Sequence, residues 1–285
     1  MAAIDRIHSP LRYPGSKSKV LKRFVPYFIP HQEYREPFLG SGSIFFGKPK
    51  VSFNWLNDKD HSVAAFFQIV RDEPEKLKER IKQCRPTIDL WKKMKASTPS
   101  TSLEIAFMFL FFNRTNFSGI ISANPIGGLQ QSSKYKIDCR WNPDLLCQRI
   151  DDCSKKLQDT TITALDYRAI VEADGDDVFI ILDPPYYTKG KQLYKEFMTM
   201  KEHQELSELL KVCKHPFLLT IDNCEETRSL YSWAHFINQE EWYYSITSQR
   251  ENVGSELFIS NFSLSDFDEN RYVKMAPLKK STSLL

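Results

Sequence analysis

The stretch IILDPPYYT, residues 180–188, places a carboxylate, two prolines and two tyrosines directly after a short apolar run. The apolar run is typical of a buried strand and the prolines end it, so we expect Asp183 at the tip of that strand. Pro184 has no N–H of its own, so the turn offers acceptors without a competing donor. Tyr186 adds an aromatic face. Alone, the pattern is also compatible with a proline turn and two surface tyrosines.

These residue types suit the exocyclic amine of a nucleobase, whose lone pair is delocalised into the ring. Two acceptors that take its hydrogens favour localisation of the lone pair and stabilise the positive charge that grows as the nitrogen attacks. We therefore predict Asp183 and the carbonyl of Pro184 as these acceptors. Tyr186 is predicted to stack on a base taken out of its helix.

Two glycine stretches could hold a ligand. YPGSKSK lacks the first glycine of a P-loop and has Ser16 instead of Lys after Gly15, which excludes that motif. In EPFLGSGSIFFG the third glycine comes too late for a pyrophosphate turn, which disfavours a dinucleotide. There remains a turn at Gly40 and Gly42, with Asp58 following after roughly 20 residues. This arrangement suits a nucleoside, or else a plain strand-to-helix turn followed by a solvated acid.

Strands and helices are expected to alternate along the chain, which implies a mainly parallel sheet covered on both faces, with its ligand site at the carboxyl ends of the strands. Thr199 and Glu202 stand in capping-box positions, which mark a helix start. We predict helices at 61–72, 73–84, 199–213 and 226–236. We predict strands at 35–38, 51–58, 161–166, 177–183 and 216–222, and a terminal hairpin from 241–248 and 256–262.

The alternation lapses between about residues 70 and 150, where helical patterns precede a stretch rich in Asn, Ser, Gly and aromatics. Such a stretch is typical of an inserted module that presents loops. We therefore assign the core domain to 1–70 and 151–274, the insertion to 71–150 and a tail to 275–285.

Composition sets wider bounds. At 285 residues the chain can form one large domain or a main domain with an insertion. Its six cysteines form no CxxC pair and no paired spacing with histidines, so we expect reduced, mostly buried thiols and no metal. No segment approaches the ~20 consecutive apolar residues of a membrane span, and the start lacks a signal-peptide run, so we expect a cytoplasmic protein without membrane contact.

The net charge is only +3, but basic residues gather near the start of the chain. This cluster favours a polyanionic partner, although a solvated amphipathic helix fits it equally well. The first 25 residues contain one acidic residue, Asp5, and six basic residues, which are Arg6, Arg12, Lys17, Lys19, Lys22 and Arg23.

Several motifs in fixed order resemble those of one family. RYPGSKSK, REPFLGSGS, LNDKD, ALDY, ILDPPYY and SELFISNF are similar to the motifs of the D12-class N6-adenine DNA methyltransferases, which include the Dam-type enzymes. FFNRTNFSG is similar to the segment that opens the target-recognition region of that family. The resemblance spans roughly Arg12 to Phe262, nearly the whole chain.

The resemblance implies transfer of a methyl group from S-adenosylmethionine to adenine N6 in double-stranded DNA, with base flipping and without a metal. It implies an α/β fold: a doubly wound, mainly parallel seven-stranded sheet with an inserted, mostly helical and loop-rich target-recognition module. Asp183 is expected to contact both cofactor and target. The implied cofactor-binding residues are Tyr13, Lys17, Pro37, Phe38, Gly40, Gly42, Asp58, Asp166, Tyr167 and Asp183.

Candidate DNA contacts follow from residue type, although each could equally be a surface side chain. For the phosphates we predict Arg12, Lys19, Lys189, Lys191 and Lys195. For the base edges we predict Arg114, Asn116, Ser118, Asn124, Gln130 and Gln131.

Two other functions remain open on the sequence: methylation of RNA adenine or of cytosine N4, and DNA binding by a protein of the same fold without catalysis. The intact Asp183 and Asp58 argue against the second. A nucleotide-dependent dehydrogenase is excluded by the glycine spacing. The recognition sequence, the presence of a cognate restriction endonuclease, a cellular or phage origin and the oligomeric state are left open.

Overall fold

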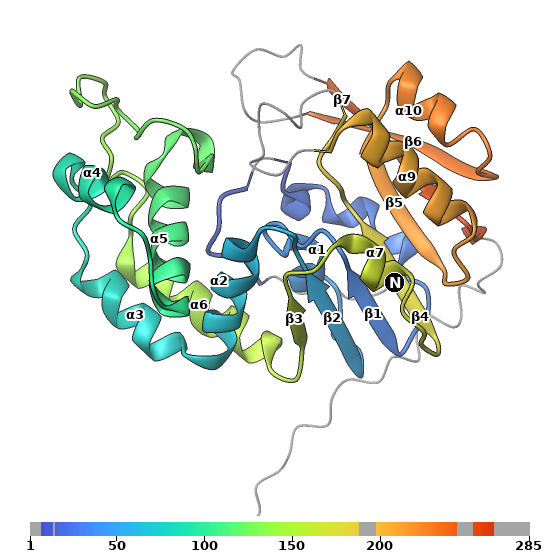
Figure 1. Cartoon of the computed structure of the whole chain (residues 1–285), viewed down its shortest axis with the longest axis horizontal. Coiled ribbons are helices and arrows are strands. Elements are labelled where there is room, and N and C mark those ends of the chain that lie inside the picture. The colour runs from blue at the N-terminus through green and yellow to red at the C-terminus, as the bar shows by residue number, and fades with distance from the viewer. Residues whose placement is uncertain (1–6, 14, 188–197, 244–252, 265–285) are drawn as a thin grey trace, which may run out of the picture.

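The computed structural model describes residues 7–13, 15–187, 198–243 and 253–264. In these ranges seven strands form one sheet in the order β3-β2-β1-β4-β5-β7-β6, seen in Figure 1. The first five strands in this order are parallel, whereas β7 runs antiparallel to both of its neighbours. The mainly parallel seven-stranded sheet is thus confirmed. The strands are β1 (Glu33–Glu36), β2 (Phe53–Asn57), β3 (Thr161–Thr163), β4 (Val178–Leu182), β5 (Phe217–Asp222), β6 (Phe236–Tyr243) and β7 (Val253–Ser260).

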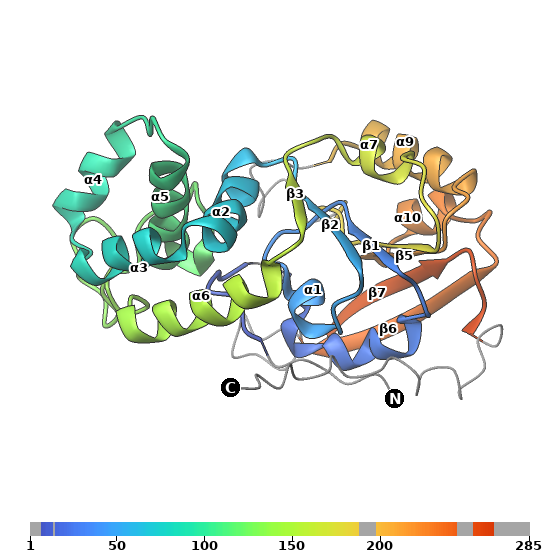
Figure 2. The ribbon, with the colours of Figure 1, turned by 90° about the horizontal axis from the view of Figure 1, so that it is seen from below.

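Helices cover both faces of the sheet, as Figure 2 shows. One face carries α7 (Tyr167–Val171), α9 (Met200–Lys211) and α10 (Glu225–Leu230). The other carries α1 (Ser43–Gly47) and three 3₁₀ turns at 17–19, 21–23 and 25–27.

Strand β4 shows how one strand serves both layers. Ile180 and Leu182 belong to the apolar cluster under α9 and α10, whereas Phe179 and Ile181 belong to the cluster under α1. Successive side chains of a strand point to opposite faces, so an unbroken apolar run is what a sheet covered on both sides requires.

A helical region lies beside the β3 edge of the sheet (Figures 1 and 2). Helix α2 packs on α5 and α6 within this region and also contacts β3 of the sheet. One apolar cluster runs through both parts. That this region recognises the target, and the domain limits given above, remain predictions. Its helices are α2 (His61–Asp72), α3 (Pro74–Gln83), α4 (Ile88–Ala96), α5 (Ser102–Thr115), the 3₁₀ turn η4 (Phe117–Gly119) and α6 (Pro143–Leu157).

Several predicted element limits were wrong. β1 covers Glu33–Glu36 rather than 35–38, β3 ends at Thr163 rather than at 166, and β7 covers Val253–Ser260 rather than 256–262. The helix predicted at 226–236 ends at Leu230, and β6 already begins at Phe236 rather than at 241. The segment between them is not helical. Its Trp233 contacts α9, because the indole N–H donates to Ser207 Oγ at 2.9 Å. Residues 244–248 of the predicted strand lie outside the described ranges.

The capping-box prediction agrees with the structure, whereas only half of the six cysteines are buried as expected. Thr199 and Glu202 form the predicted capping box of α9. The six cysteines are free thiols, of which Cys84, Cys147 and Cys153 are buried.

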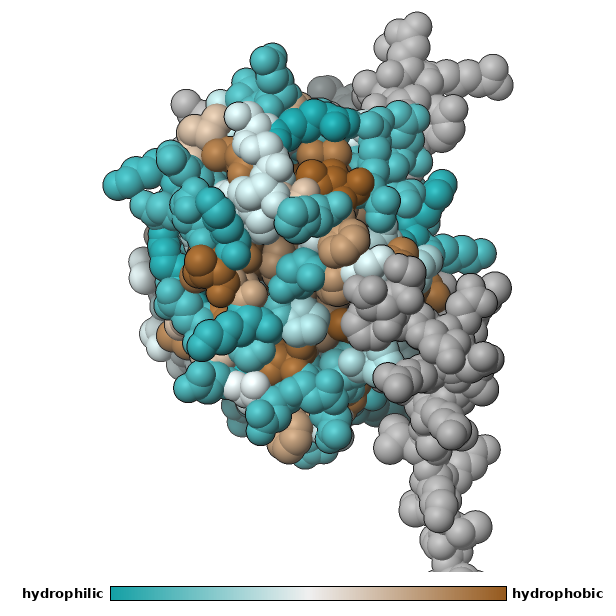
Figure 3. All heavy atoms as spheres, turned by 90° about the vertical axis from the view of Figure 1, so that its right-hand side faces the viewer, coloured by the Kyte–Doolittle hydropathy of each residue, from teal (hydrophilic) through white to brown (hydrophobic). Residues whose placement is uncertain are grey.

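The face around α9, α10 and β6 is of an ordinary kind for a protein surface. Figure 3, which looks onto the side of α9, α10 and β6, shows mostly hydrophilic residues with scattered hydrophobic ones. Within the described ranges, the helices are too short or too polar to cross a bilayer.

Candidate active site

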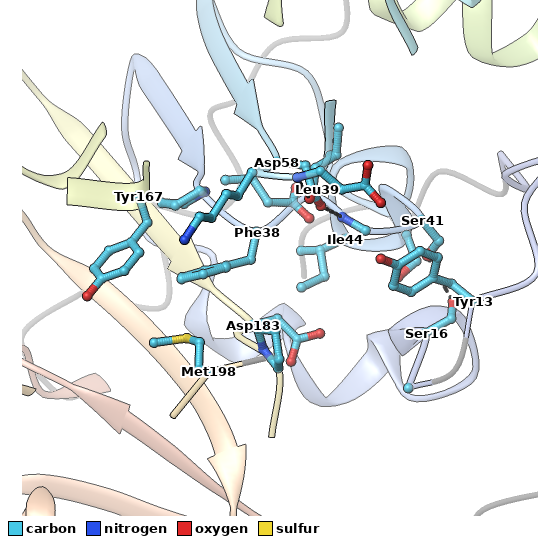
Figure 4. Close-up of a pocket in the computed structure, with 18 of the residues that line it drawn as sticks. Tyr13, Ser16, Phe38, Leu39, Ser41, Ile44, Asp58, Tyr167, Asp183 and Met198 are labelled. Carbon is cyan, nitrogen blue, oxygen red and sulfur yellow. Dashed lines mark hydrogen bonds between the residues drawn. The ribbon is translucent and has the colours of Figure 1, made fainter. Parts of the chain in front are cut away.

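A pocket opens at the carboxyl ends of β1, β2 and β4. β1 and β4 are neighbours in the sheet although β2 and β3 separate them in the chain, so the strand order reverses here. Open parallel sheets bind their ligands at such a point. Figure 4 shows the lining side chains. The pocket is lined by Tyr13, Gly15, Ser16, Glu36, Pro37, Phe38, Leu39, Gly40, Ser41, Ser43, Ile44, Asp58, Lys59, Asp60, Tyr167, Asp183, Pro185, Met198 and Glu202.

Most of the predicted cofactor-binding residues meet in this pocket, although they come from five separate stretches of the chain. Lys17, Gly42 and Asp166 do not line it. Those that do are Tyr13, Pro37, Phe38, Gly40, Asp58, Tyr167 and Asp183.

The carboxylate of Asp183 lies at the pocket edge with 20% of its side chain exposed. Lys17 Nζ donates to both of its oxygens, at 2.7 and 2.8 Å. Thr220 of β5 donates from Oγ1 to Asp183 Oδ1 at 2.9 Å. The carboxylate is therefore held in one orientation from two directions, while it still faces the pocket.

Tyr186 and the two prolines complete the turn after β4. Lys17 Nζ lies 2.7 Å from the Tyr186 hydroxyl oxygen, and the tyrosine is only 9% exposed. Pro185 lines the pocket, whereas Pro184 is buried and does not line it. Tyr186 shares Lys17 with Asp183 and does not line this pocket either.

The glycine turn after β1 is built around Asp58. Gly40, with φ of 50°, donates its N–H to Asp58 Oδ2 at 2.8 Å, and Asp60 donates its N–H to Oδ1 at 2.9 Å. A Cβ on Gly40 would lie 3.2 Å from the Tyr13 ring, so a side chain would crowd this wall. The predicted turn and the predicted acid therefore form one unit.

Gly42 has a different task. It adopts φ of 68° as the N-cap of α1, and a Cβ there would lie 2.8 Å from the Phe46 ring. The absence of a side chain leaves room for the Phe46 ring of α1, so Gly42 shapes the turn from outside the pocket.

Aromatic residues form one side of the pocket. The rings of Phe38 and Tyr167 lie 5.3 Å apart between centroids, and Figure 4 shows Met198 on the same side, opposite Tyr13. Burial raises the pKa of Tyr167 to about 12, so its hydroxyl is neutral at physiological pH. This side presents two aromatic rings, tilted by 32° to each other, and a thioether.

Asp166 caps α7 by accepting from the Arg168 N–H at 3.1 Å. It also pairs with the Arg168 guanidinium at 2.9 Å. These contacts give Asp166 a structural role at the start of α7.

Glu36 is a lining residue that the sequence did not suggest. It is 2% exposed and accepts from the Tyr34 hydroxyl at 2.7 Å and from the Phe45 N–H. Burial, and then the charge of Asp183, raise its pKa to about 8, although the Tyr34 bond opposes this. The pocket lining therefore contains a carboxyl group, that of Glu36, which favours its protonated form at neutral pH.

Comparison with known proteins identifies the family. A model of the family described as D12 class N6 adenine-specific DNA methyltransferase matches residues 13–246, most of the chain. The chain belongs to this family. Its match extends from the first glycine stretch through the helical region to the strands beyond Asp183.

Curated relatives of this methyltransferase chain carry related names. It is 25% identical to the Type II methyltransferase M.CviBI of Paramecium bursaria Chlorella virus NC1A over 254 residues, 87% of this chain and 95% of that protein. It is 23% identical to the DNA adenine methylase of Vibrio cholerae over 185 residues, 62% of this chain and 64% of that protein. The modification methylase StsI of Streptococcus sanguinis is 22% identical, with 92% of this chain and 44% of that protein covered.

Two predicted base-reading residues of the methyltransferase have inward positions. Asn116 is 0% exposed, accepts from Trp91 Nε1 at 2.7 Å and donates to the carbonyls of Ile120 and Ile121. Because a fully buried, fully engaged amide cannot reach a base, we assign Asn116 to holding its loop. Gln131 has the same role, since it donates to the carbonyl of Ile126 and accepts from the Ile137 N–H.

The other DNA candidates are distributed differently. Arg114 is 6% exposed, and Arg12 and Ser118 are half-buried. Lys19, Asn124 and Gln130 are exposed. The remaining candidates, Lys189, Lys191 and Lys195, lie outside the described residues.

Sequence reasoning also missed several lining residues. Ser16 and Ser41 flank the glycines of their motifs, which was a usable signal. Met198 precedes the N-cap of α9 and Glu202 lies in its first turn, and no local pattern marks them as pocket residues.

Proposed function

We propose that the protein transfers a methyl group from S-adenosylmethionine to the N6 amine of adenine in duplex DNA, with the target adenine flipped out. The family match supports the base and the nucleic acid. The observation that supports the catalytic part most directly is the carboxylate of Asp183, which is fixed by Lys17 and Thr220 and still open to the pocket.

The pocket fits S-adenosylmethionine. Gly40 leaves its wall without a side chain, so a ligand can approach the main chain. Asp58 has carboxylate oxygens suited to ribose hydroxyls. Phe38 and Tyr167 offer aromatic rings against which an adenine ring can pack. When bound, the cofactor supplies an activated methyl group on a sulfonium.

Asp183 acts on the amine of the target base. Its carboxylate accepts a hydrogen bond from one N6 hydrogen, and the carbonyl of Pro184 is the proposed hydrogen-bond acceptor for the second. Together they favour localisation of the nitrogen lone pair and stabilise the charge that develops on it, a kind of contribution worth several kcal/mol (about 3–4 per group). The orientation of Asp183 is set before the base arrives, so little reorganisation is needed.

The loop after α5 is the proposed entry side for DNA. Phe117 exposes 66% of its surface there, next to Ser118 with φ of 55°. An exposed aromatic ring can enter a base step and help to extrude a nucleotide. Asn124 and Gln130 lie on the same loop and remain the proposed base contacts.

We further propose a cytoplasmic location, where DNA and the methyl donor are both present. We also propose a cognate restriction endonuclease as a genetic partner. The names of the relatives M.CviBI and StsI, a Type II methyltransferase and a modification methylase, support this part.

The test uses the full chain with labelled S-adenosylmethionine and unmethylated genomic DNA, followed by sequencing for modified bases. We expect N6-methyladenine at one short sequence. Asp183→Ala should lower the rate by a factor on the order of 10³ without loss of the folded state, because it removes the charged acceptor.

Glu208→Ala is the matched control, because it removes an exposed carboxylate on α9, and it should keep wild-type activity. Label on cytosine or only on RNA would replace the proposed substrate by one of the alternatives. Near wild-type turnover by Asp183→Ala would refute its assigned role.

A further inference from the structure

Lys17 lies at the centre of a buried polar network behind Asp183. It is 2% exposed and comes from the 3₁₀ turn at 17–19. Its Nζ lies within 2.8 Å of both Asp183 oxygens, at 2.7 Å from the Tyr186 hydroxyl oxygen and at 3.2 Å from the Gly15 carbonyl. Three N–H donors thus meet four acceptors, so the ammonium group is fully engaged.

Lys17 also has a buried carboxylate on its other side. Glu256 of β7 is 1% exposed, and its Oε2 lies 3.8 Å from Lys17 Nζ. The ammonium also lies 4.9 Å from the centroid of the Tyr186 ring. One cation therefore separates two carboxylates in a region of little water, where an unpaired charge is costly.

Thr220 fixes the same carboxylate from the neighbouring strand. It is 0% exposed, and its Oγ1 donates to Asp183 Oδ1. An ionised carboxylate offers about four acceptor positions. Among the described residues, Lys17 takes one on each oxygen and Thr220 takes a second on Oδ1. One position on Oδ2 is left for a ligand.

We propose that Lys17 and Thr220 are positioning residues that hold Asp183 so that a single acceptor position faces the target amine. Lys17 also sets the position of Tyr186. This replaces the expectation that Lys17 binds the cofactor, and it agrees with the absence of Lys17 from the pocket lining. The proposal rests on the proposed methyl transfer to adenine.

The experiment compares Thr220→Val with Thr220→Ser. Valine has nearly the same shape as threonine but no hydroxyl, whereas serine keeps the donor. The dissociation constant for S-adenosylmethionine is measured by titration, and the methylation rate is measured in a single turnover at saturating cofactor and DNA. We expect Thr220→Val to lower this rate on the order of tenfold, with cofactor affinity within about twofold, and Thr220→Ser to restore most of the rate.

Lys17→Met should lower the single-turnover rate more strongly, on the order of a hundredfold, because it also leaves Asp183 and Glu256 without their shared cation. Thermal melts show whether it folds, and the Thr220 pair decides the question if it does not. In the double variant the two losses should not add, since both act through one carboxylate.

The opposite pattern overturns the proposal. If the variants weaken cofactor binding but reach the wild-type rate at saturation, Lys17 is a cofactor ligand. Wild-type methylation of adenine is measured in the same series, so a failure of the proposed function shows in the parent protein. A failure of the positioning role shows only in the variants.

Discussion

Glu36 illustrates how one side chain can link the pocket to stability. Its carboxyl group anchors α1 through the Phe45 N–H and the core through the Tyr34 hydroxyl. Its pKa is raised from the ordinary 4.5 to about 8, chiefly by burial. The folded state therefore keeps a proton that the unfolded state releases.

The sign of this effect on stability is fixed by linkage. Below pH 4.5 both states hold the proton, and above about pH 8 neither does. Between these values the unfolded chain binds fewer protons, so the free energy of unfolding falls as the pH rises. The fall contributed by Glu36 is up to about 1.4 kcal/mol per pH unit.

We expect Glu36→Gln to remove this contribution, because an amide imitates the neutral carboxyl but cannot ionise. Urea unfolding of both proteins between pH 5 and 8 measures it, and wild-type stability relative to the variant should decline with pH. A difference that stays constant across this range would show that Glu36 does not titrate there.

Residues in short motifs could be predicted from the sequence, and residues that act across the fold could not. Asp183, Gly40 and Asp58 follow strands in recognisable patterns. The role of Lys17 depends on Asp183, which lies 166 residues away. That of Glu36 depends on its burial. Neither distance nor burial can be read from a local pattern.

Two helices begin with the same device in different surroundings. Thr101 and Glu104 form a capping box at the start of α5, and Thr199 and Glu202 form one at the start of α9. Only the second adjoins the pocket, because Met198 and Glu202 line it. A comparison of the two caps therefore distinguishes an effect on helix stability from an effect on ligand binding.

Thr199→Ala and Thr101→Ala should each lower the free energy of unfolding by about 1 kcal/mol, since each removes a cap. Only Thr199→Ala should also raise the dissociation constant for S-adenosylmethionine, because it loosens one side of the pocket. Thermal unfolding and cofactor titration check the two effects. Equal cofactor affinities in the two variants would show that the start of α9 does not contribute to cofactor binding.

Element types were predicted better than element limits. The unbroken apolar runs of β4 and β5 identified central strands, and the capping box located α9. The start of β6 was placed five residues late, since the segment before it has aromatic residues at helical spacing. This segment instead holds Trp233 against α9, and such a tertiary contact cannot be read from local spacing.

The N-terminal segment joins the sheet to the helical region. The Arg12 N–H donates to Asn113 Oδ1 at 2.7 Å, and Asn113 Nδ2 donates back to the Arg12 carbonyl at 2.6 Å. Gly119 has φ of 79°, and a Cβ there would lie 2.4 Å from that carbonyl oxygen. The first motif therefore contacts both the catalytic pocket and the loop side proposed for DNA.

Positive charge gathers at the same place. Burial, and then the charges of Arg149, Arg12 and Arg140, lower the pKa of Arg114 to about 9. Arg140 likewise lowers the pKa of Arg12, after burial. Guanidinium groups that repel one another in the free protein are stabilised when a phosphate binds between them.

We expect Arg140→Ala to weaken DNA binding uniformly across sequences, because Arg140 is exposed and would meet the backbone. The slope of log affinity against log salt should become shallower by about 0.9. Lys211→Ala, which removes an exposed charge on α9, is the control and should leave the slope unchanged. An unchanged slope for Arg140→Ala would place the DNA elsewhere.

The link between Lys17 and its partners has a consequence for synthesis of the protein. A ribosome makes Lys17 early, but Asp183, Thr220 and Glu256 emerge only in the last part of the chain. A chain that ends before residue 183 therefore holds the lysine with the Gly15 carbonyl but without the carboxylates that it contacts in the finished fold. The complete network around Asp183 can form only after residue 256 has been made, so we expect fragments that end before β7 to lack the rate of the full chain.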